Sequence, residues 1–443
     1  MTDRRLFFII LAFYLVLATT VSVIVPLGES PDEADHYAYA RYLALNRALP
    51  EGPEVTQGKH PPLYYGLAAL VGGWTGMKLF LQPNPDVFPI RPDGPANFFI
   101  HVENEAFPWK DGPLAFHLAR FLSVLFGAVT LFGAWRIGQE AFPERRDVGL
   151  LAAAFLAALP GFLYISGSMN NDNAAAAFGS LIILIMVRMI QKGMSWMRTF
   201  ILGLLLGLGL LSKVGVLSLW PLLVFPLLGG LWSHRRAMLA WLTMAGHGLV
   251  AWGLGVLVAS PWLLRNWRLY GDPLGWELVR QTVDIREGPV DFAVLVWLVK
   301  GLYTYFWGRF GAIGQIWLPG WAYVMAAFFL ILIVSGIFIF LKKWWKGTFH
   351  QAMLFLLLLG APFFILSGII NYTRLALGTD QARLLWPSIA VIGVWFAIGL
   401  AGLSDMTTIS QRLSPPWRVL VILGCFTTTS LMVFWMLNLY FAH

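Results

Sequence analysis

Acidic side chains crowd together in residues 28–37, which have the sequence Gly-Glu-Ser-Pro-Asp-Glu-Ala-Asp-His-Tyr. Four carboxylates and one imidazole fall within about two helical turns. They belong to Glu29, Asp32, Glu33, Asp35 and His36. Pro31 can open a helix whose dipole favours acidic residues in the first turn, so capping would explain some of the carboxylates. It does not explain all four, because crowded like charges raise one another's pKa, which suits a general base or a metal site.

A basic pair precedes two prolines in the segment Gly58-Lys59-His60-Pro61-Pro62. The prolines fix the chain where an apolar segment, 60–76, begins. One interpretation is a stiff turn with a lysine that extends to the membrane surface. The other is an anion site, because the unpaired N–H groups of a helix N-terminus favour phosphate.

Two further charges stand beside apolar runs. Asp172 lies in the polar segment 168–173, where Asn and Asp are usual turn formers and where the aspartate could cap the next helix. Lys213 stands between Leu211 and Val214, and a charge at membrane depth is rare unless it is paired or lines a cavity. We therefore expect Lys213 to face Asp172 or a bound anion.

Arg265 and Arg268 follow Pro261-Trp262 at a spacing of three residues. Arginines and aromatic residues at the end of a membrane span are common anchors. The alternative is a pair of guanidinium groups that clamps phosphate oxygens.

The composition indicates how these side chains are positioned. Of 443 residues, 58% are hydrophobic and only 12% are charged, and apolar runs long enough to cross a bilayer recur along the chain. The net charge of +8 does not indicate nucleic-acid binding, because the basic residues bracket apolar runs or share loops with carboxylates. The single cysteine, Cys425, excludes an internal disulfide.

We predict an all-α polytopic membrane protein with about eleven transmembrane helices. The predicted spans are 6–26, 116–137, 148–166, 174–190, 199–212, 214–232, 238–260, 322–341, 351–369, 384–403 and 417–438. The first is interpreted as a retained helix, since it is long for a signal peptide and lacks a convincing cleavage site.

Every second short connection between these spans is basic. The residues are Arg4, Arg5, Arg145, Arg146, Lys192, Arg198, Arg235, Arg236, Lys342, Lys343, Lys346 and Arg412. The positive-inside rule then places the N-terminus in the cytoplasm and the long segments 27–115 and 261–321 outside. We expect a helix at 33–48, interfacial helices at 60–76 and 292–305, and irregular structure at 83–113.

With these motifs in order, the chain resembles the GT-C superfamily of membrane glycosyltransferases, especially lipid A aminoarabinose transferases and protein O-mannosyltransferases. The resemblance includes Asp32-Glu33 after the first helix and His60-Pro61-Pro62 opening a juxtamembrane helix. It also includes the segment 207–213 ending in Ser212-Lys213, the Pro-Trp segment before Arg265, and Asp172. It covers roughly the first 270 residues.

The resemblance implies inverting transfer of a sugar from a polyprenyl-phosphate donor to a glycan, lipid or protein acceptor, in the extracytoplasmic space of the cell inner (plasma) membrane. Asp32 and Glu33 would be catalytic, and donor phosphate would be bound by Lys59, His60, Arg265 and Arg268. Supporting or acceptor-side roles would fall to Asp35, His36, Asp172 and Lys213. Lys59 replaces an acidic residue of the aminoarabinose transferases, which leaves a divalent metal cofactor open.

On this basis we divide the chain into a catalytic module, 1–270, a second outer loop, 271–321, and C-terminal helices, 322–443. The main alternative function is a lipid-linked sugar flippase or transporter, although such proteins often have repeated halves and place charges at the bilayer midplane. A non-catalytic scaffold is a further alternative. The sequence identifies neither the sugar nor the acceptor.

Overall fold

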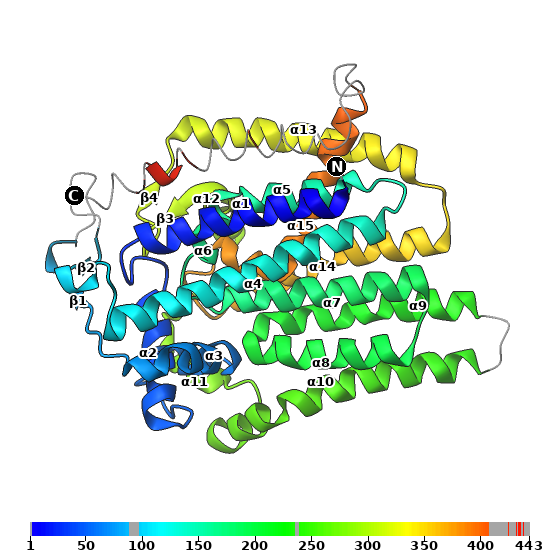
Figure 1. Ribbon diagram of the computed structural model, residues 1–443. Coiled ribbons are helices and arrows are strands. Elements are labelled where there is room, and N and C mark those ends of the chain that lie inside the picture. Colours follow the sequence, from blue (N-terminus) through cyan, green and yellow to red (C-terminus); the bar gives the residue numbers. More distant parts are fainter. Residues whose placement is uncertain are drawn as a thin grey trace.

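Long helices that run alongside one another dominate the computed structural model of the chain (Figure 1). The structure describes residues 2–87, 97–234 and 239–406, together with 424, 431, 433–435 and 437. The strands in this part of the chain form two small antiparallel pairs, so the all-α prediction is confirmed.

Eight helices in the described part of the chain are long and apolar enough to cross a membrane. Six of them are continuous α-helices: α1 (Asp3–Ile24), α4 (Asp111–Ala141), α7 (Asp172–Lys192), α10 (Ala240–Tyr270), α13 (Gly320–Trp344) and α14 (Phe349–Thr373). The other two begin as 3-10 helices: η5 (Val214–Leu223) with α9 (Val224–Ser233), and η6 (Ala382–Ser388) with α15 (Ile389–Ser404).

The count of eleven spans is therefore not confirmed. The predicted span 148–166 is two helices, α5 (Asp147–Ala157) and α6 (Pro160–Ser166), bent by 67°, and together they give a ninth candidate. The bend falls at Pro160, which lacks the N–H needed to continue α5. The predicted span 199–212 is the shorter helix α8 (Trp196–Ser212). The predicted span 417–438, Arg235, Arg236 and Arg412 lie outside the continuously described residues.

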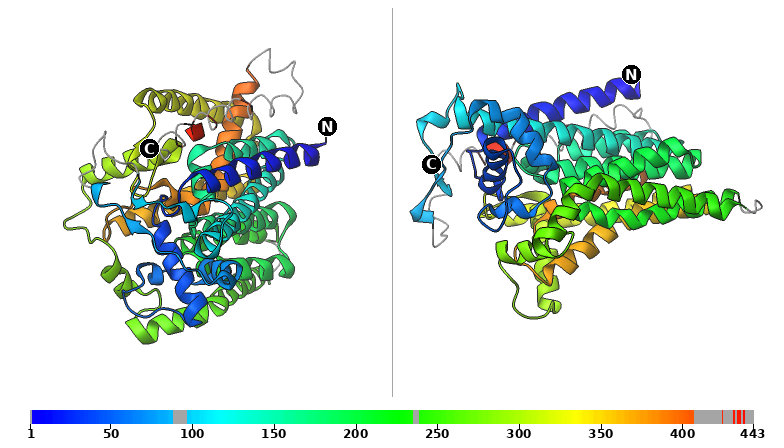
Figure 2. Two further views of the ribbon diagram at one scale, coloured as in Figure 1. Left: turned by 60° about the vertical axis from the view of Figure 1, so that its left-hand side comes forward. Right: turned by 90° about the horizontal axis from the view of Figure 1, so that it is seen from below.

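The connecting elements gather at the end of the bundle opposite the N-terminus (Figure 2). The segment predicted as the first outer loop contains α2 (Glu33–Asn46), η1 (Thr56–Lys59), α3 (Leu63–Gly72), η2 (Gly73–Thr75), β1 (Gln82–Pro83), η3 (Pro85–Val87), β2 (Phe99–Ile100) and η4 (Glu103–Glu105). The second contains α11 (Trp276–Thr282), α12 (Phe292–Gly308), β3 (Arg309–Phe310) and β4 (Ile316–Trp317). The expected short helices near 33–48, 60–76 and 292–305 are thus present.

Small residues bring the helices that position this end into close contact. A Cβ on Gly133 of α4 would lie 2.4 Å from Ser180 Oγ of α7. A Cβ on Gly179 of α7 would lie 2.0 Å from the carbonyl oxygen of Pro387 in η6. Close backbone approach therefore places η6 against α7. This contact positions the side chains of η6 at the end of the bundle where the connecting elements gather.

Candidate active site

Asp32 lies at the turn between α1 and α2, at the position preceding the helix. Its φ of 59° is in the left-handed region, which non-glycine residues seldom adopt and which Asp tolerates better than most. Such conformations cluster at functional sites. The side chain is 45% exposed, whereas the residues on either side of it, Pro31 and Glu33, are buried. Asp32 is therefore the accessible carboxylate of this turn.

Arg383, a residue that sequence reasoning missed, joins two of the predicted site residues. It lies in η6, donates from Nη2 to Asp32 Oδ2, and donates from Nη1 to Asp172 Oδ2 at 3.2 Å. Gln381 holds the same guanidinium through Nε at 2.7 Å. The signal in the sequence was an arginine just before the predicted span 384–403, at the end that is predicted to lie outside, where the positive-inside rule does not expect a cation.

Lys213 forms an ion pair with Asp172, as expected from the cost of burying a lone charge. Asp172 is fully buried at the start of α7, so its two oxygens are shared between Lys213 and Arg383. Asp32, Asp172, Lys213 and Arg383 thus form one connected group, which we call the charge cluster.

Glu33 is engaged elsewhere. Its carboxylate forms two hydrogen bonds with Arg120, from Nε at 2.8 Å and from Nη2 at 2.7 Å, and both side chains are fully buried. The backbone N–H groups of Met169 and Gly28 donate to the same carboxylate. A carboxylate with these lone pairs occupied is poorly suited to accept a proton, so the structure argues against the predicted catalytic role for Glu33.

His36 and Tyr65 are a buried, hydrogen-bonded pair of side chains beside the charge cluster. His36 Nδ1 and the Tyr65 hydroxyl are hydrogen-bonded at 2.8 Å, and the His36 Nε2 atom is buried without a partner. The His36 ring also stacks on His60 at 6.4 Å between centroids. Burial, with the cations Arg383, Lys213 and Lys59, lowers the pKa of His36 to about 3. His36 is therefore a neutral ring at physiological pH.

Lys59 lies at the same end of the molecule and is nearly buried. Its ammonium donates to the Thr282 carbonyl of α11 at 3.1 Å. Burial lowers the pKa of Lys59, and the nearby carboxylates of Asp32 and Asp35 oppose that shift. Burial and the positive charge of Lys59 also lower the pKa of His60 well below its usual value. Of this predicted phosphate-binding pair, only Lys59 can supply positive charge.

The contacts of Arg265 argue against the predicted arginine clamp. Arg265 donates to the carbonyls of Pro50 at 2.7 Å and Leu49 at 3.4 Å, and it lies 3.9 Å from Glu51. Arg268 is exposed on α10. Arg265 therefore fastens the predicted first outer segment to α10, and its Nη2 group is already hydrogen-bonded within the protein.

The surrounding charges shift the pKa values of Asp32 and Asp35 in opposite directions. The surrounding protein opposes ionisation of Asp32, but the charge and hydrogen bond of Arg383, together with the charge of Lys59, hold its pKa down to about 2. At Asp35, burial and the charge of Asp32 raise the pKa, and the charge of Lys59 offsets this rise only in part. In this arrangement Asp32 is ionised and held by Arg383.

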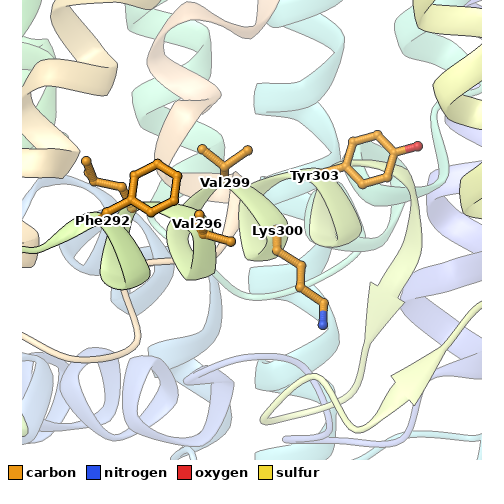
Figure 3. Close-up of a pocket in the computed structure, with 6 residues that line it drawn as sticks. Phe292, Val296, Val299, Lys300 and Tyr303 are labelled. Atoms are coloured by element: carbon orange, nitrogen blue, oxygen red, sulfur yellow. The ribbon is translucent and has the colours of Figure 1, made fainter.

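No group of three or more His, Cys, Asp or Glu side chains among the described residues is arranged to hold a metal ion. A shallow hollow on α12 is apolar apart from Lys300 and Tyr303. Figure 3 shows the residues that line it, which all belong to α12. The hollow contains no carboxylate, so the candidate active site is the charge cluster.

Solved structures with the same fold are membrane glycosyltransferases. The chain superposes on ArnT from Cupriavidus metallidurans bound to undecaprenyl phosphate with a TM-score of 0.55 and 14% identity, covering 93% of this chain and 61% of that one. It also superposes on the Archaeoglobus fulgidus oligosaccharyltransferase tethered to an acceptor peptide, with a TM-score of 0.52 and 14% identity, covering 100% of this chain and 56% of that one. The chain thus spans roughly three fifths of these neighbours' length. It is a multi-pass membrane protein with the GT-C fold.

One segment of the sequence also matches a family model. Residues 116–264 match the model of the dolichyl-phosphate-mannose-protein mannosyltransferases. No curated protein sequence gives a significant match. The matched segment contains Asp172 and Lys213, and it excludes both Asp32 and Arg383.

Proposed function

We propose that this protein is an inverting glycosyltransferase that moves a sugar from a polyprenyl-phosphate donor to a nucleophile of an extracytoplasmic acceptor. The observation that supports this most directly is the charge cluster, in which an accessible carboxylate, Asp32, is held next to buried cations at the loop end of the bundle. A base and a set of cations are the two parts that sugar transfer from a phosphate leaving group needs.

Asp32 would accept the proton of the acceptor nucleophile as that nucleophile attacks the anomeric carbon. The bond between this carbon and the phosphate oxygen breaks on the opposite face, and its electrons remain on the phosphate. Arg383, Lys213 and Lys59 would stabilise the growing negative charge. The phosphate leaves without protonation, so one carboxylate is sufficient.

The Arg383 contacts suggest how the donor prepares the base. While the guanidinium is bound to Asp32, the pKa of this carboxyl is about 2, and its affinity for a proton is low. A donor phosphate that attracts Arg383 would weaken this ion pair and raise the pKa of Asp32 towards the range of a useful base. Binding of donor and activation of the base would then be linked through one side chain.

The neighbouring structures support the donor and acceptor classes. One is described with undecaprenyl phosphate and the other with an acceptor peptide. The matched family model is named for a dolichyl-phosphate-mannose donor and a protein acceptor. A flippase or transporter is not favoured, because the charges gather where the outer segments meet the bundle, whereas transporters bind near the midplane.

The membrane placement follows from the basic connections. Arg4, Arg5, Arg145 and Arg146 lie at the end of the bundle opposite α2 and α3. By the positive-inside rule that end would be cytoplasmic, and the charge cluster would face the exterior of the cell inner membrane. Residues 1–270 would form most of the catalytic module, and the C-terminal helices would contribute Arg383. We assign no metal to this mechanism.

The test is sugar transfer by purified protein in detergent, where transport cannot generate product. The protein would be incubated with a panel of polyprenyl-phosphate sugars, and release of polyprenyl phosphate would be measured, with water as the nucleophile in place of the acceptor. We expect Asp32→Asn to lower kcat by about a hundredfold or more with its melting temperature retained, because a positioned base contributes about 10²–10⁴-fold.

The matched control is Glu103→Gln, which replaces an exposed carboxylate of the same outer segment by an amide. It should turn over at the wild-type rate. Wild-type turnover by Asp32→Asn would refute the assignment of the base. Failure of every donor to bind or react with wild-type protein would refute the proposed function.

A further inference from the structure

A group of basic side chains at the opposite end of the bundle has no part in the proposed reaction. Glu140, near the end of α4, accepts hydrogen bonds from Arg136 at 2.6 Å and from Arg188 at 2.8 Å. Lys192 forms a third ion pair with it at 2.9 Å. Three cations thus converge on one carboxylate, and we call these four residues the basic cluster.

The basic cluster holds more positive charge than Glu140 can neutralise. Three positive charges and one negative charge leave an excess of two. The Glu140 side chain is 6% exposed, whereas the three cations are between 27% and 51% exposed, so the cations form the outer surface. The Nε atom of Arg136 is buried without a partner. An anion placed on this surface would relieve the repulsion among the three cations and accept hydrogen bonds from their exposed N–H groups.

Each helix continues from the basic cluster into an apolar stripe. On α4, Leu125 and Phe132 precede Arg136 at helical spacing, and they are 60% and 39% exposed. On α7, the partly exposed Leu181 precedes Arg188 by seven residues. The two helices pack along their length and run in the same direction (Figure 1). The surface is therefore basic at one end and apolar along the rest, as an amphipathic anion requires.

We propose that the basic cluster binds the headgroup of an anionic phospholipid, with an acyl chain along Phe132 and Leu181. The phosphate oxygens contact Arg136, Arg188 and Lys192. Basic pockets between transmembrane helices recognise anionic lipid headgroups in this way. The site lies at the other end of α4 and α7 from Asp172, and it is independent of the glycosyltransferase proposal.

The experiment measures lipid binding to the purified full-length chain in neutral detergent. Native mass spectrometry and melting temperature would be recorded with phosphatidylglycerol, with zwitterionic phosphatidylcholine, and with inorganic phosphate. We expect phosphatidylglycerol to bind at least about fivefold more tightly than phosphatidylcholine, and inorganic phosphate to give no comparable stabilisation. Equal binding of the two lipids, or equal stabilisation by inorganic phosphate, would overturn the proposal.

Two variants change the charge of the basic cluster in opposite directions. Arg188→Gln should weaken phosphatidylglycerol binding about fivefold, and Glu140→Gln should strengthen it by a similar factor, because the excess positive charge falls to one or rises to three. The control Lys346→Gln removes an exposed cation paired with exposed Glu144 and should leave binding unchanged. A purely structural network predicts instead that Glu140→Gln loses stability without gaining lipid affinity, and that result would overturn the proposal.

Discussion

Asp32 and Glu33 are neighbours in the sequence with different environments. The left-handed conformation at Asp32 directs its carboxylate to an accessible position beside Arg383, whereas the Glu33 carboxylate is enclosed by Arg120 and two backbone N–H groups. An ionised group that is fully paired and buried stabilises a local arrangement. Glu33 therefore fixes the turn that presents Asp32.

Replacing Arg383 should alter the acidity of Asp32. In Arg383→Gln the neighbouring cation is lost, so the pKa of Asp32 should rise from about 2 towards that of an ordinary carboxyl. The acidic limb of the kcat/KM profile of the free enzyme should therefore move to higher pH. In Arg383→Lys the positive charge is present again, so the pKa of Asp32 should fall part of the way back. Little turnover should return, because an ammonium cannot reach both Asp32 and Asp172 as a planar guanidinium does. An unchanged acidic limb in Arg383→Gln would contradict this assignment.

Breaking the pair between Glu33 and Arg120 should chiefly affect folding. Glu33→Gln leaves a buried guanidinium without its counter-ion, which costs about 3–5 kcal/mol in typical buried pairs. We expect a much lower melting temperature, with turnover per folded molecule retained. The double variant Glu33→Gln with Arg120→Met should recover part of the stability. A stable, inactive Glu33→Gln would instead favour a direct catalytic role.

At the scale of elements, the β1–β2 pair covers the acidic turn. Glu29 is buried and accepts from the Phe99 backbone N–H at 2.9 Å and from His101 Nε2 at 3.2 Å. The other ring nitrogen of His101 lies 2.8 Å from Glu105. Because both ring nitrogens face carboxylates, the doubly protonated imidazolium is the form that fastens this strand pair over residues 28–33.

This contact predicts a dependence of stability on pH. Burial alone would lower the pKa of His101, but hydrogen bonds and charge from Glu105 and Glu29 raise it from 6.5 to about 9. The contribution of His101 is then complete below pH 6.5 and is lost as pH rises through about 9. The difference in melting temperature between wild type and His101→Gln should shrink over this interval. A difference that stays constant from pH 6 to 10 would refute the cationic contact.

At the scale of the whole molecule, the C-terminal helices complete the candidate site. Arg383 comes from η6, whose continuation α15 packs closely against α13. A Cβ on Gly402 of α15 would lie 2.0 Å from the carbonyl oxygen of Gly336 in α13. Helices in membranes associate through such small residues, because close backbone approach increases van der Waals contact. The boundary predicted at residue 270 therefore does not separate the site from the rest of the chain.

Substitution at this crossing should destabilise the bundle. Gly402→Ala forces α13 and α15 apart, and overpacking of this kind costs about 1–3 kcal/mol. The control Gly253→Ala places a methyl group on α10 where no atom lies within 4 Å, and it should be neutral or stabilising by up to about 1 kcal/mol. Thermal unfolding in one detergent compares the two variants. Equal melting temperatures would show that the crossing tolerates a side chain.

Local patterns in the sequence were sufficient for the membrane architecture and for part of the site. Runs of apolar residues specify helices because a bilayer leaves backbone polar groups no other partners, so most predicted spans have a counterpart in the described helices. From the cost of an unpaired charge at membrane depth we expected Lys213 to face Asp172 or a bound anion, and it pairs with Asp172. The acidic turn and the GT-C resemblance likewise depend on residues close together in the chain.

Only the tertiary structure showed that Asp32 and Glu33 have different surroundings, argued against the arginine clamp and brought Arg383 next to Asp32. Asp32 and Arg383 are 351 positions apart, and no periodicity or spacing relates them. The roles of Glu33 and Arg265 depend on which groups fill their hydrogen bonds, namely Arg120 and the carbonyls of residues 49 and 50. A side chain's chemistry is set by such neighbours, and helix packing, rather than local sequence, decides which neighbours meet.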